Sequence, residues 1–327
     1  MIDEAMAHFK YSVAFVQDML RARTFQDIQA MSLLVLQLRG LRRPGACWIF
    51  GQLTVNLAVD CGLHRSVDSL SAQERQQMSD SAIEARKRVF WALYGLVSNN
   101  STRLGRPPPL RLVDIDIEFP LPVHDYLEHE GHSLTEFQKC SFRVGITIAK
   151  LLALFSDLHS TFYTITKPPT LDYWKAVAKF KEDLELWHAD VPPEISESAS
   201  AENELTMYAM YLDLFEAEFR FLLYHPLLHP SSQPASFQRT VAACEAAISD
   251  ALQLLLKIRD LKSLDVPWHT TTLLLAMTFT QLFIGDQRSD EVTLLGYHKL
   301  ESDMNTWLDL FGTVGEMLGK SSRSRWH

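Results

Sequence analysis

The sequence predicts an all-α protein, and three observations support this fold class. Apolar residues recur at intervals of three and four along most of the chain, as they do on one face of an α-helix. Prolines and glycines interrupt the pattern where helices would end. Alternation with a period of two occurs only within residues 105–122, and one extended segment cannot make a sheet. We therefore expect roughly nine to twelve helices, in one body or in two lobes, with one extended strap at about residues 105–122.

Three helices are expected before residue 63. Residues 3–21 carry an apolar stripe at helical spacing. Thr24 and Asp27 have the spacing of a capping box and predict that a second helix begins there. Pro44 suits the first turn of a third helix, and Gly62 is placed to end it.

The rest of the chain reads as further helices joined by polar or proline-containing links. Residues 64–81 are polar and predict a loop with one short helical piece. A long helix follows, and the glycine and prolines from Gly105 onward stop it. Six more segments have helical length and pattern, at about residues 134–163, 170–189, 202–224, 236–262, 267–284 and 290–318.

Charge and cysteine usage exclude several classes of protein. Lysine and arginine number 31 against 40 acidic residues, so the formal charge of -9 gives no overall attraction to nucleic acid. The four cysteines lie far apart, without the paired spacing of zinc sites, and are predicted to be core residues in a reducing compartment: Cys47, Cys61, Cys140 and Cys244.

Membrane and secretion signals are not expected either. The N-terminal segment has acidic residues near its start and lacks the apolar run of a signal peptide. The most apolar stretch, Trp268 to Ile284, is interrupted by polar side chains and is too short to cross a bilayer, so we predict a buried helix there.

Candidate metal and catalytic groups are weak. His124, His129 and His132 lie close together, but their spacing is not that of a helical zinc motif and a solvated loop explains them better. Asp114 and Asp116 have no histidine or third carboxylate tied to them by local spacing. No nucleophile elbow or phosphate-binding loop occurs in the sequence. We therefore expect no metal or cofactor in this chain and no enzymatic activity.

Four short landmarks occur in a fixed order within residues 29–122. They are a Gly-Leu-His-Arg turn, a helix with arginines followed by an aromatic pair and a tyrosine, a Gly-Arg-Pro stop, and an Asp-x-Asp strap that ends near prolines. In order and spacing they resemble the fungal-specific transcription factor domain, the middle homology region of fungal binuclear-zinc-cluster transcription factors. The matching positions are Gly62, Leu63, His64 and Arg65; Arg86, Arg88, Phe90, Trp91 and Tyr94; Gly105, Arg106 and Pro107; and Asp114, Asp116 and Pro120.

One departure from the family pattern stands out. The family often carries Asp-Arg after the aromatic helix segment, where Val97 and Ser98 stand here. Any ion pair that these two positions make in relatives is therefore not expected in this chain.

These landmarks also have structural roles that need no chemistry. Gly105 can adopt the left-handed conformation that closes a helix, and the prolines after it force an extended exit. Asp114 and Asp116 would lie about 7 Å apart on one face of an extended segment. We expect them to form a clamp with arginines of the landmarks, namely Arg86, Arg88 or Arg106. A structural clamp is favoured over a catalytic pair.

The resemblance implies a function for the whole of residues 1–327. It implies a regulatory or effector domain of a fungal transcription factor, located in the nucleus and acting on RNA polymerase II transcription of metabolic genes. The six-cysteine zinc cluster that reads DNA in this family is not in the sequence, so DNA contact and zinc are expected only through such a missing N-terminal cluster.

Partners of the chain are predicted with alternatives left open. A cavity lined by Phe90, Trp91 and Tyr94 would couple a small-molecule effector or a protein of the transcription machinery to activity. Simple core packing is the alternative for these three residues. A ligand-free dimerisation or scaffold module and a helical enzyme of unrecognised class are the alternative functions. A homodimer is one expected assembly, and no membrane partner is expected.

Overall fold

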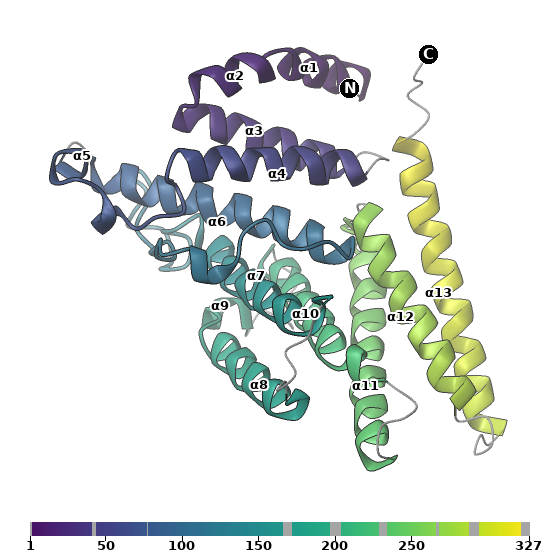
Figure 1. Ribbon diagram of the computed structural model, residues 1–327. Coiled ribbons are helices and arrows are strands. Elements are labelled where there is room, and N and C mark those ends of the chain that lie inside the picture. The colour runs from purple at the N-terminus through teal and green to yellow at the C-terminus, as the bar shows by residue number, and fades with distance from the viewer. Residues whose placement is uncertain are drawn as a thin grey trace. The chain divides into compact units, whose positions relative to one another are not determined.

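The computed structural model describes residues 2–40, 44–76, 78–165, 172–196, 204–228, 234–265, 268–287 and 294–321. Throughout these ranges the regular elements are helices, with no strand (Figure 1). The prediction of an all-α fold is confirmed. Among the described helices, none combines the length and the hydropathy needed to cross a bilayer.

The chain divides into two compact units, of which the first comprises Met1–Pro168 with Lys179–Glu197 and the second comprises Pro169–Ala178 with Ser198–His327. The helices that precede the strap are α1 Ile2–Ala14, α2 Val16–Ala22, α3 Phe25–Arg39, α4 Pro44–Asp60, η1 Val67–Ser69, α5 Ala72–Gln76 and α6 Asp80–Arg103. After these come η2 Leu112–Asp114, α7 Arg143–Phe162, α8 Tyr173–Ala189, α9 Pro193–Ser196, α10 Glu204–Tyr224, η4 His225–Leu227, α11 Pro234–Asp260, α12 Trp268–Gln287 and α13 Leu294–Ser321.

Local capping chemistry sets several helix ends where the sequence predicted them. Thr24 and Asp27 form a reciprocal capping box at the start of α3, with Thr24 N 2.8 Å from the Asp27 carboxylate. Pro44 is the first residue of α4. At the end of α4, Gly62 has a φ of 66°, and Leu63 N donates to Ala58 O at 2.8 Å. This pair of features closes the helix with a left-handed glycine.

The predicted first helix is interrupted. Residues 3–21 were expected to be continuous, but the structure has two helices, α1 and α2, that meet at Phe15. Phe15 N–H donates to Ser12 O at 3.2 Å, a bond to the third preceding residue in place of the fourth. The helical ladder therefore tightens and breaks at this position, which periodicity alone could not indicate.

The helix predicted at residues 134–163 begins later, at Arg143. The preceding segment folds into a loop that Asp125 closes. The Asp125 carboxylate accepts hydrogen bonds from Ser141 N at 2.8 Å and Ser141 Oγ at 2.7 Å. Lys139 O also accepts from Asp125 N at 3.0 Å, so these backbone groups are satisfied without a helix.

The core of the first unit is built around α6, with α3, α4 and α7 packed on it. α4 approaches α6 closely at Gly51. A Cβ built on Gly51 would lie 2.9 Å from Val97 Cγ2, a distance that real side chains avoid. Val97 itself is buried in the core. Glycine at this position is therefore what lets the two helices come together.

The core of the second unit lies between α10, α11, α12 and α13. Trp307 of α13 is fully buried, and its Nε1 donates to Gln281 Oε1 of α12 at 2.9 Å. Gln281 Nε2 in turn donates to Asp303 at 2.9 Å. This chain of hydrogen bonds gives the polar atoms of Trp307 and Gln281 partners at the α12–α13 contact.

The four cysteines are free thiols, as their spacing indicated. Cys47, Cys140 and Cys244 are buried, and Cys61 is half-buried. Burial raises the pKa of the Cys47 thiol to about 11 and that of Cys244 to about 12. Both therefore stay protonated and unreactive near neutral pH, in line with a role as core residues.

Candidate functional site

The strap leaves α6 through the glycine that the sequence indicated. Gly105 has a φ of 63°, and Arg106 N donates to Ser101 O at 2.8 Å. The left-handed conformation predicted for Gly105 is therefore confirmed. Beyond it, the Arg106 guanidinium lies over the ring of Trp48, 4.4 Å from the centroid, and ties the start of the strap to α4 by a cation–π contact.

The strap is extended only in part. It forms one turn of 3-10 helix, Leu112–Asp114, before it becomes extended at Ile115, where φ is -117° and ψ is 124°. Asp114 therefore belongs to a turn and Asp116 to the extended part. The prediction that both aspartates share one face of a single extended run was wrong.

From Leu110 onward, the strap runs back along α6 in the opposite direction. The later a residue comes in the strap, the earlier its partner lies in α6. Three hydrogen bonds mark this course: Tyr94 Oη to Leu110 O at 3.1 Å, Trp91 Nε1 to Glu118 O at 3.0 Å, and Leu121 N to Glu84 Oε2 at 2.9 Å. They pair strap backbone atoms with side chains of α6, so backbone polar groups that a sheet would have satisfied find partners on the helix.

The Gly-Leu-His-Arg turn holds the middle of the strap. His64 O accepts hydrogen bonds from Asp116 N and Ile117 N, both at 3.2 Å. The Asp116 carboxylate accepts from Ser66 N at 2.8 Å and pairs with Arg65 Nε at 2.9 Å. These bonds lower the pKa of Asp116, with the Ser66 amide as the larger stabilising cause and Arg65 next. Asp116 therefore stays ionised and fixes the strap to the turn.

A buried ion pair supports the end of the strap. Lys87 Nζ lies 2.9 Å from Glu84 Oε1, and each side chain is only 10% exposed. The other carboxylate oxygen of Glu84 accepts from Leu121 N. Glu118, close by, has a lowered pKa, because it accepts a 2.6 Å hydrogen bond from the Ser66 hydroxyl and is near Lys87. This group was not identified from the sequence, although Glu84 and Lys87 have the spacing of a helical ion pair.

The predicted arginine partners were wrong. Asp116 pairs with Arg65, and Asp114 pairs with Arg111 at 2.8 Å. The three arginines proposed as partners go elsewhere: Arg86 donates to Gly62 O, Arg88 pairs with Asp125 at 2.9 Å, and Arg106 lies on Trp48. A clamp that fixes the strap is present, but it is the Arg65–Asp116 pair, because Arg111 and Asp114 both belong to the strap.

Arg86 and Arg88 still serve the same region. Arg86 is buried, and desolvation lowers the pKa of its guanidinium. Its bond to the Gly62 carbonyl fixes the turn that holds the strap. Arg88 reaches Asp125, which closes the loop after the strap. Burial tends to raise the pKa of Asp125, but hydrogen bonds from Ser141 and Arg88 outweigh it and the pKa is lowered.

The aromatic residues that were predicted to line an effector cavity lie in the interior of the first unit. Phe90, Trp91 and Tyr94 are 1%, 4% and 1% exposed. Trp91 stacks on Phe119 of the strap with ring centroids 4.1 Å apart. Tyr94 Oη is 2.7 Å from Ser156 Oγ of α7, and burial raises the pKa of Tyr94. These positions are those of core residues that anchor the strap, and an effector role for them stays a prediction.

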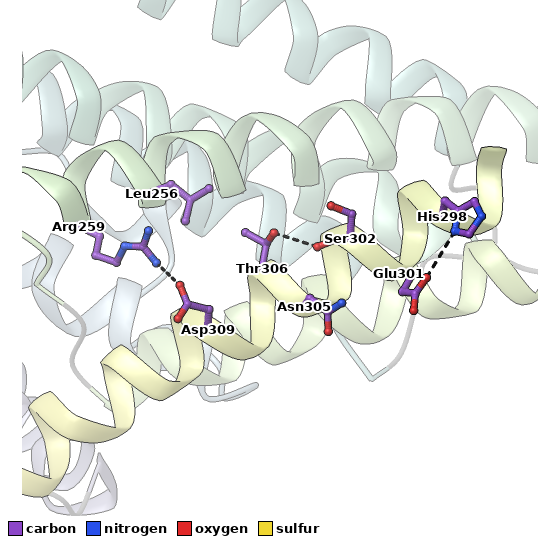
Figure 2. Close-up of a pocket in the computed structure, with 8 residues that line it drawn as sticks. All are labelled: Leu256, Arg259, His298, Glu301, Ser302, Asn305, Thr306 and Asp309. Carbon is purple, nitrogen blue, oxygen red and sulfur yellow. Dashed lines mark hydrogen bonds and ion pairs between the residues drawn. The ribbon is translucent and has the colours of Figure 1, made fainter.

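An open groove lies elsewhere, between α11 and α13 of the second unit (Figure 2). It has a volume of about 600 Å³ and is lined by Leu256, Arg259, His298, Glu301, Ser302, Asn305, Thr306 and Asp309. Arg259 Nη1 is 2.7 Å from Asp309, and His298 Nδ1 is 3.6 Å from Glu301, so each acidic side chain of the lining has a nitrogen partner within the groove (Figure 2). The lining is polar and differs from the aromatic cavity that was predicted.

The three clustered histidines lie in the exposed loop before α7, as the solvated-loop interpretation expected. His124, His129 and His132 are all exposed. Over the residues that the structure describes, no three histidine, cysteine or acidic side chains come together in a way that could hold a metal ion.

Comparison with known proteins identifies the family. The family described as "Fungal specific transcription factor domain" matches residues 5–189, more than half of the chain. The chain belongs to this family. The match is wider than the region of the landmarks and takes in the strap, its clamp and the helices up to α8. This family is a transcription factor domain and not a family of enzymes.

Several fungal regulators are similar to this chain. "Activator of stress genes 1" of Saccharomyces cerevisiae is 25% identical over 248 residues, which cover 72% of this chain and 25% of that protein. "Nitrogen assimilation transcription factor nirA" of Emericella nidulans is 23% identical over 300 residues, 86% of this chain and 32% of that protein. An "ABC-transporter-regulating transcription factor" of Aspergillus oryzae is 23% identical over 175 residues, 53% of this chain and 19% of that protein. The chain thus spans a third or less of the length of these relatives, and no solved structure matches it.

Proposed function

We propose that this chain is the regulatory domain of a fungal transcription factor, and that it acts in the nucleus on RNA polymerase II transcription of metabolic or transporter genes. The observation that carries the proposal is the family match over residues 5–189, within which the strap is fixed to α6. Relatives named for nitrogen assimilation and for regulation of an ABC transporter support the choice of target genes.

In this proposal the chain regulates and does not itself read DNA. Its formal charge of -9 offers no general attraction to phosphates. Its four cysteines are single, mostly buried thiols without zinc-site spacing. DNA contact and zinc belong to a zinc cluster of the kind found in the family. The domain would contact the transcription machinery or co-regulators.

The test is a tethering assay in yeast. The full chain is fused to an unrelated DNA-binding domain, and a reporter with the matching binding site is measured. We expect reporter output to differ from that of the DNA-binding domain alone, in either direction, and a tagged chain to accumulate in the nucleus. Output equal to that of the tether alone, with the fusion expressed, would contradict the proposal.

A pair of strap variants tests whether the clamp matters for this activity. Trp91→Ala removes the ring that stacks on Phe119 and the donor to Glu118 O. Val113→Ala changes a strap side chain that is 83% exposed. We expect the first variant to lose the reporter effect and the second to keep it. Equal reporter output from both variants, at equal protein levels, would argue against a role for the fixed strap.

Control by a small-molecule effector is the finer part of the proposal. A metabolite that binds the folded chain raises its unfolding temperature, because binding stabilises the native state by about 2.7 kcal/mol at a hundred times its dissociation constant. We expect one member of a panel of nitrogen and carbon metabolites to do so. A flat response across the panel would favour a domain that works through protein contacts alone.

A further inference from the structure

The outer face of α12 carries three large apolar side chains in a row. Leu275 is 40% exposed, Phe279 is 64% exposed and Leu282 is 41% exposed. They follow one another at spacings of four and three residues, which places them on one face of the helix. This pattern differs from that of an ordinary surface helix, whose outer face is polar.

The opposite face of α12 is packed against the rest of the second unit. Leu273, Leu274, Met277 and Ile284 are buried. Gln281 bonds to α13, and α12 packs alongside α11 and α13 (Figure 1). The exposed row is therefore not left over from a poorly packed helix. A helix that is apolar on both sides is typical of one that is covered on both sides.

The order of side chains along the exposed face reads nearly the same in both directions. Phe279 is at the centre, a leucine lies on each side of it, and the polar residues Thr272 and Asp286 lie seven positions away on either side. Two antiparallel copies of α12, related by a two-fold axis at Phe279, would place Leu275 of one copy beside Leu282 of the other. Such self-complementarity is what a symmetric dimer requires. We propose that this face binds the same face of a second copy of the chain.

Charge also favours a second copy over a different partner. Residues 268–285 contain no lysine, arginine, aspartate or glutamate. Each chain carries a formal charge of -9, so two copies repel each other overall. Between Thr272 and Gly285 this face presents no charge to a second copy, and in the antiparallel pair Asp286 would lie opposite Thr272 and not opposite another carboxylate.

The size of the row sets the strength of the association. Stable dimers bury about 800 Å² on each partner, and three partly exposed side chains supply only part of that area. We therefore expect a weak dimer that forms at micromolar or higher concentration. In a complete transcription factor, tethering of two copies on neighbouring DNA sites would raise their effective concentration. The proposal itself does not depend on a transcriptional role, because self-association is measured without DNA.

Sedimentation velocity of the full chain over a concentration series tests the proposal. We expect the wild-type chain to shift from monomer to dimer as concentration rises. Phe279→Glu places two like charges at the two-fold axis and should raise the dissociation constant at least about tenfold. The matched control is Leu308→Glu, a leucine of α13 in the same unit that is 67% exposed, and it should leave the dissociation constant unchanged.

Cysteine cross-linking tests the geometry. In the antiparallel pair, position 279 faces itself, so Phe279→Cys should form a disulfide-linked dimer under mild oxidation. The two copies of position 275 would lie about 12 Å apart along the helix axis, from a rise of about 1.5 Å per residue, so Leu275→Cys alone should not cross-link. A mixture of Leu275→Cys and Leu282→Cys chains should cross-link. The wild-type chain, with its four native cysteines, is the control.

Several results would overturn the proposal. One is a wild-type chain that stays monomeric to several hundred micromolar. Another is a dimer that Phe279→Glu leaves intact, or that Leu308→Glu weakens as much, because either would place the interface elsewhere. A third is efficient cross-linking of Leu275→Cys with itself, since that requires parallel helices. These outcomes leave the proposed regulatory function untouched, so failure of one is distinguishable from failure of the other.

Discussion

The buried pair of Glu84 and Lys87 predicts a strongly non-additive response to mutation. Lys87→Met removes the cation and leaves the Glu84 carboxylate, 10% exposed, which still accepts a hydrogen bond from Leu121 N at 2.9 Å. Loss of one partner of a buried ion pair costs about 3–5 kcal/mol, because a charge is left without compensation. The retained Leu121 bond places the expected cost near the lower end, at about 3 kcal/mol.

Neutralising the second partner should recover most of this loss. In the double variant Glu84→Gln with Lys87→Met, no buried charge remains, and the amide oxygen introduced at position 84 can still accept from Leu121 N. Replacement of a whole buried pair by uncharged groups of similar size is often close to neutral. We therefore expect the double variant to be less destabilised than the Lys87→Met single variant, by about 1–2 kcal/mol.

Urea unfolding of the full chain measures these differences. The midpoint is compared for the wild type, both single variants and the double variant, with the slope checked for constancy because the chain has two units. Arg111→Met is a control, since its pair with Asp114 is exposed at the surface and its loss should shift the midpoint little. A loss of stability in Lys87→Met as small as in Arg111→Met would refute the predicted effect of burial, as would a double variant that loses the sum of the two single losses.

Three further perturbations have defined outcomes. Gly105→Ala should lower the free energy of unfolding by about 1–2 kcal/mol, because φ is 63° at this position. Gly45→Ala inside α4 should not lower it, although a Cβ has open space at both positions. Thermal unfolding of the two variants makes the comparison. The pKa of Asp116 lies below its ordinary value of 3.8 in the folded chain. The ionised Asp116 carboxylate therefore stabilises the fold above pH 3.8, and this stabilisation is lost as the pH falls through the folded pKa. Unfolding midpoints measured between pH 5 and pH 3 should fall less for Asp116→Asn than for wild type. Trp91→Phe removes the donor to the strap and should speed hydrogen exchange at the Ile117 amide, as measured by mass spectrometry or NMR, while unchanged exchange would mean that the strap does not depend on this bond.

Features that depend on a few neighbouring residues were predictable from the sequence. The capping box of Thr24 and Asp27 and the helix ends at Gly62 and Gly105 rest on local backbone chemistry, and the structure confirms all of them. The all-α fold was equally readable, because helical periodicity repeats in every long segment. The break at Phe15 was not readable, since the apolar stripe continues across it.

The partners of charged side chains were not predictable in the same way. Asp116 was given the wrong arginine because sequence spacing does not show that the Gly62–Arg65 turn folds over the strap. Arg65 and Ser66 N reach the carboxylate only through that tertiary contact. Arg86, by contrast, donates to the backbone carbonyl of Gly62 in the turn. Every residue has such a carbonyl, so the sequence does not indicate which one will accept.

The sequence indicated where the candidate site lies, but not which side chains contact one another there. The sequence landmarks lie largely on α6 and the strap, and that is where side chains from distant segments converge. The buried pair of Glu84 and Lys87 was missed because its importance comes from burial, which periodicity indicates only for apolar residues. The course of the strap along α6 was also missed, since it is set by single hydrogen bonds between residues 16 to 37 positions apart in the sequence.

The reversed course of the strap determines how tension on the chain would be felt. Because the strap retraces α6 toward its beginning, a pull applied at residue 122 first loads the Leu121–Glu84 bond near the N-terminal part of the helix. The bonds at Trp91 and Tyr94 would open later and in that order. The strap would thus detach from α6 one hydrogen bond at a time. The glycine turn at Gly105 would be the last point to move.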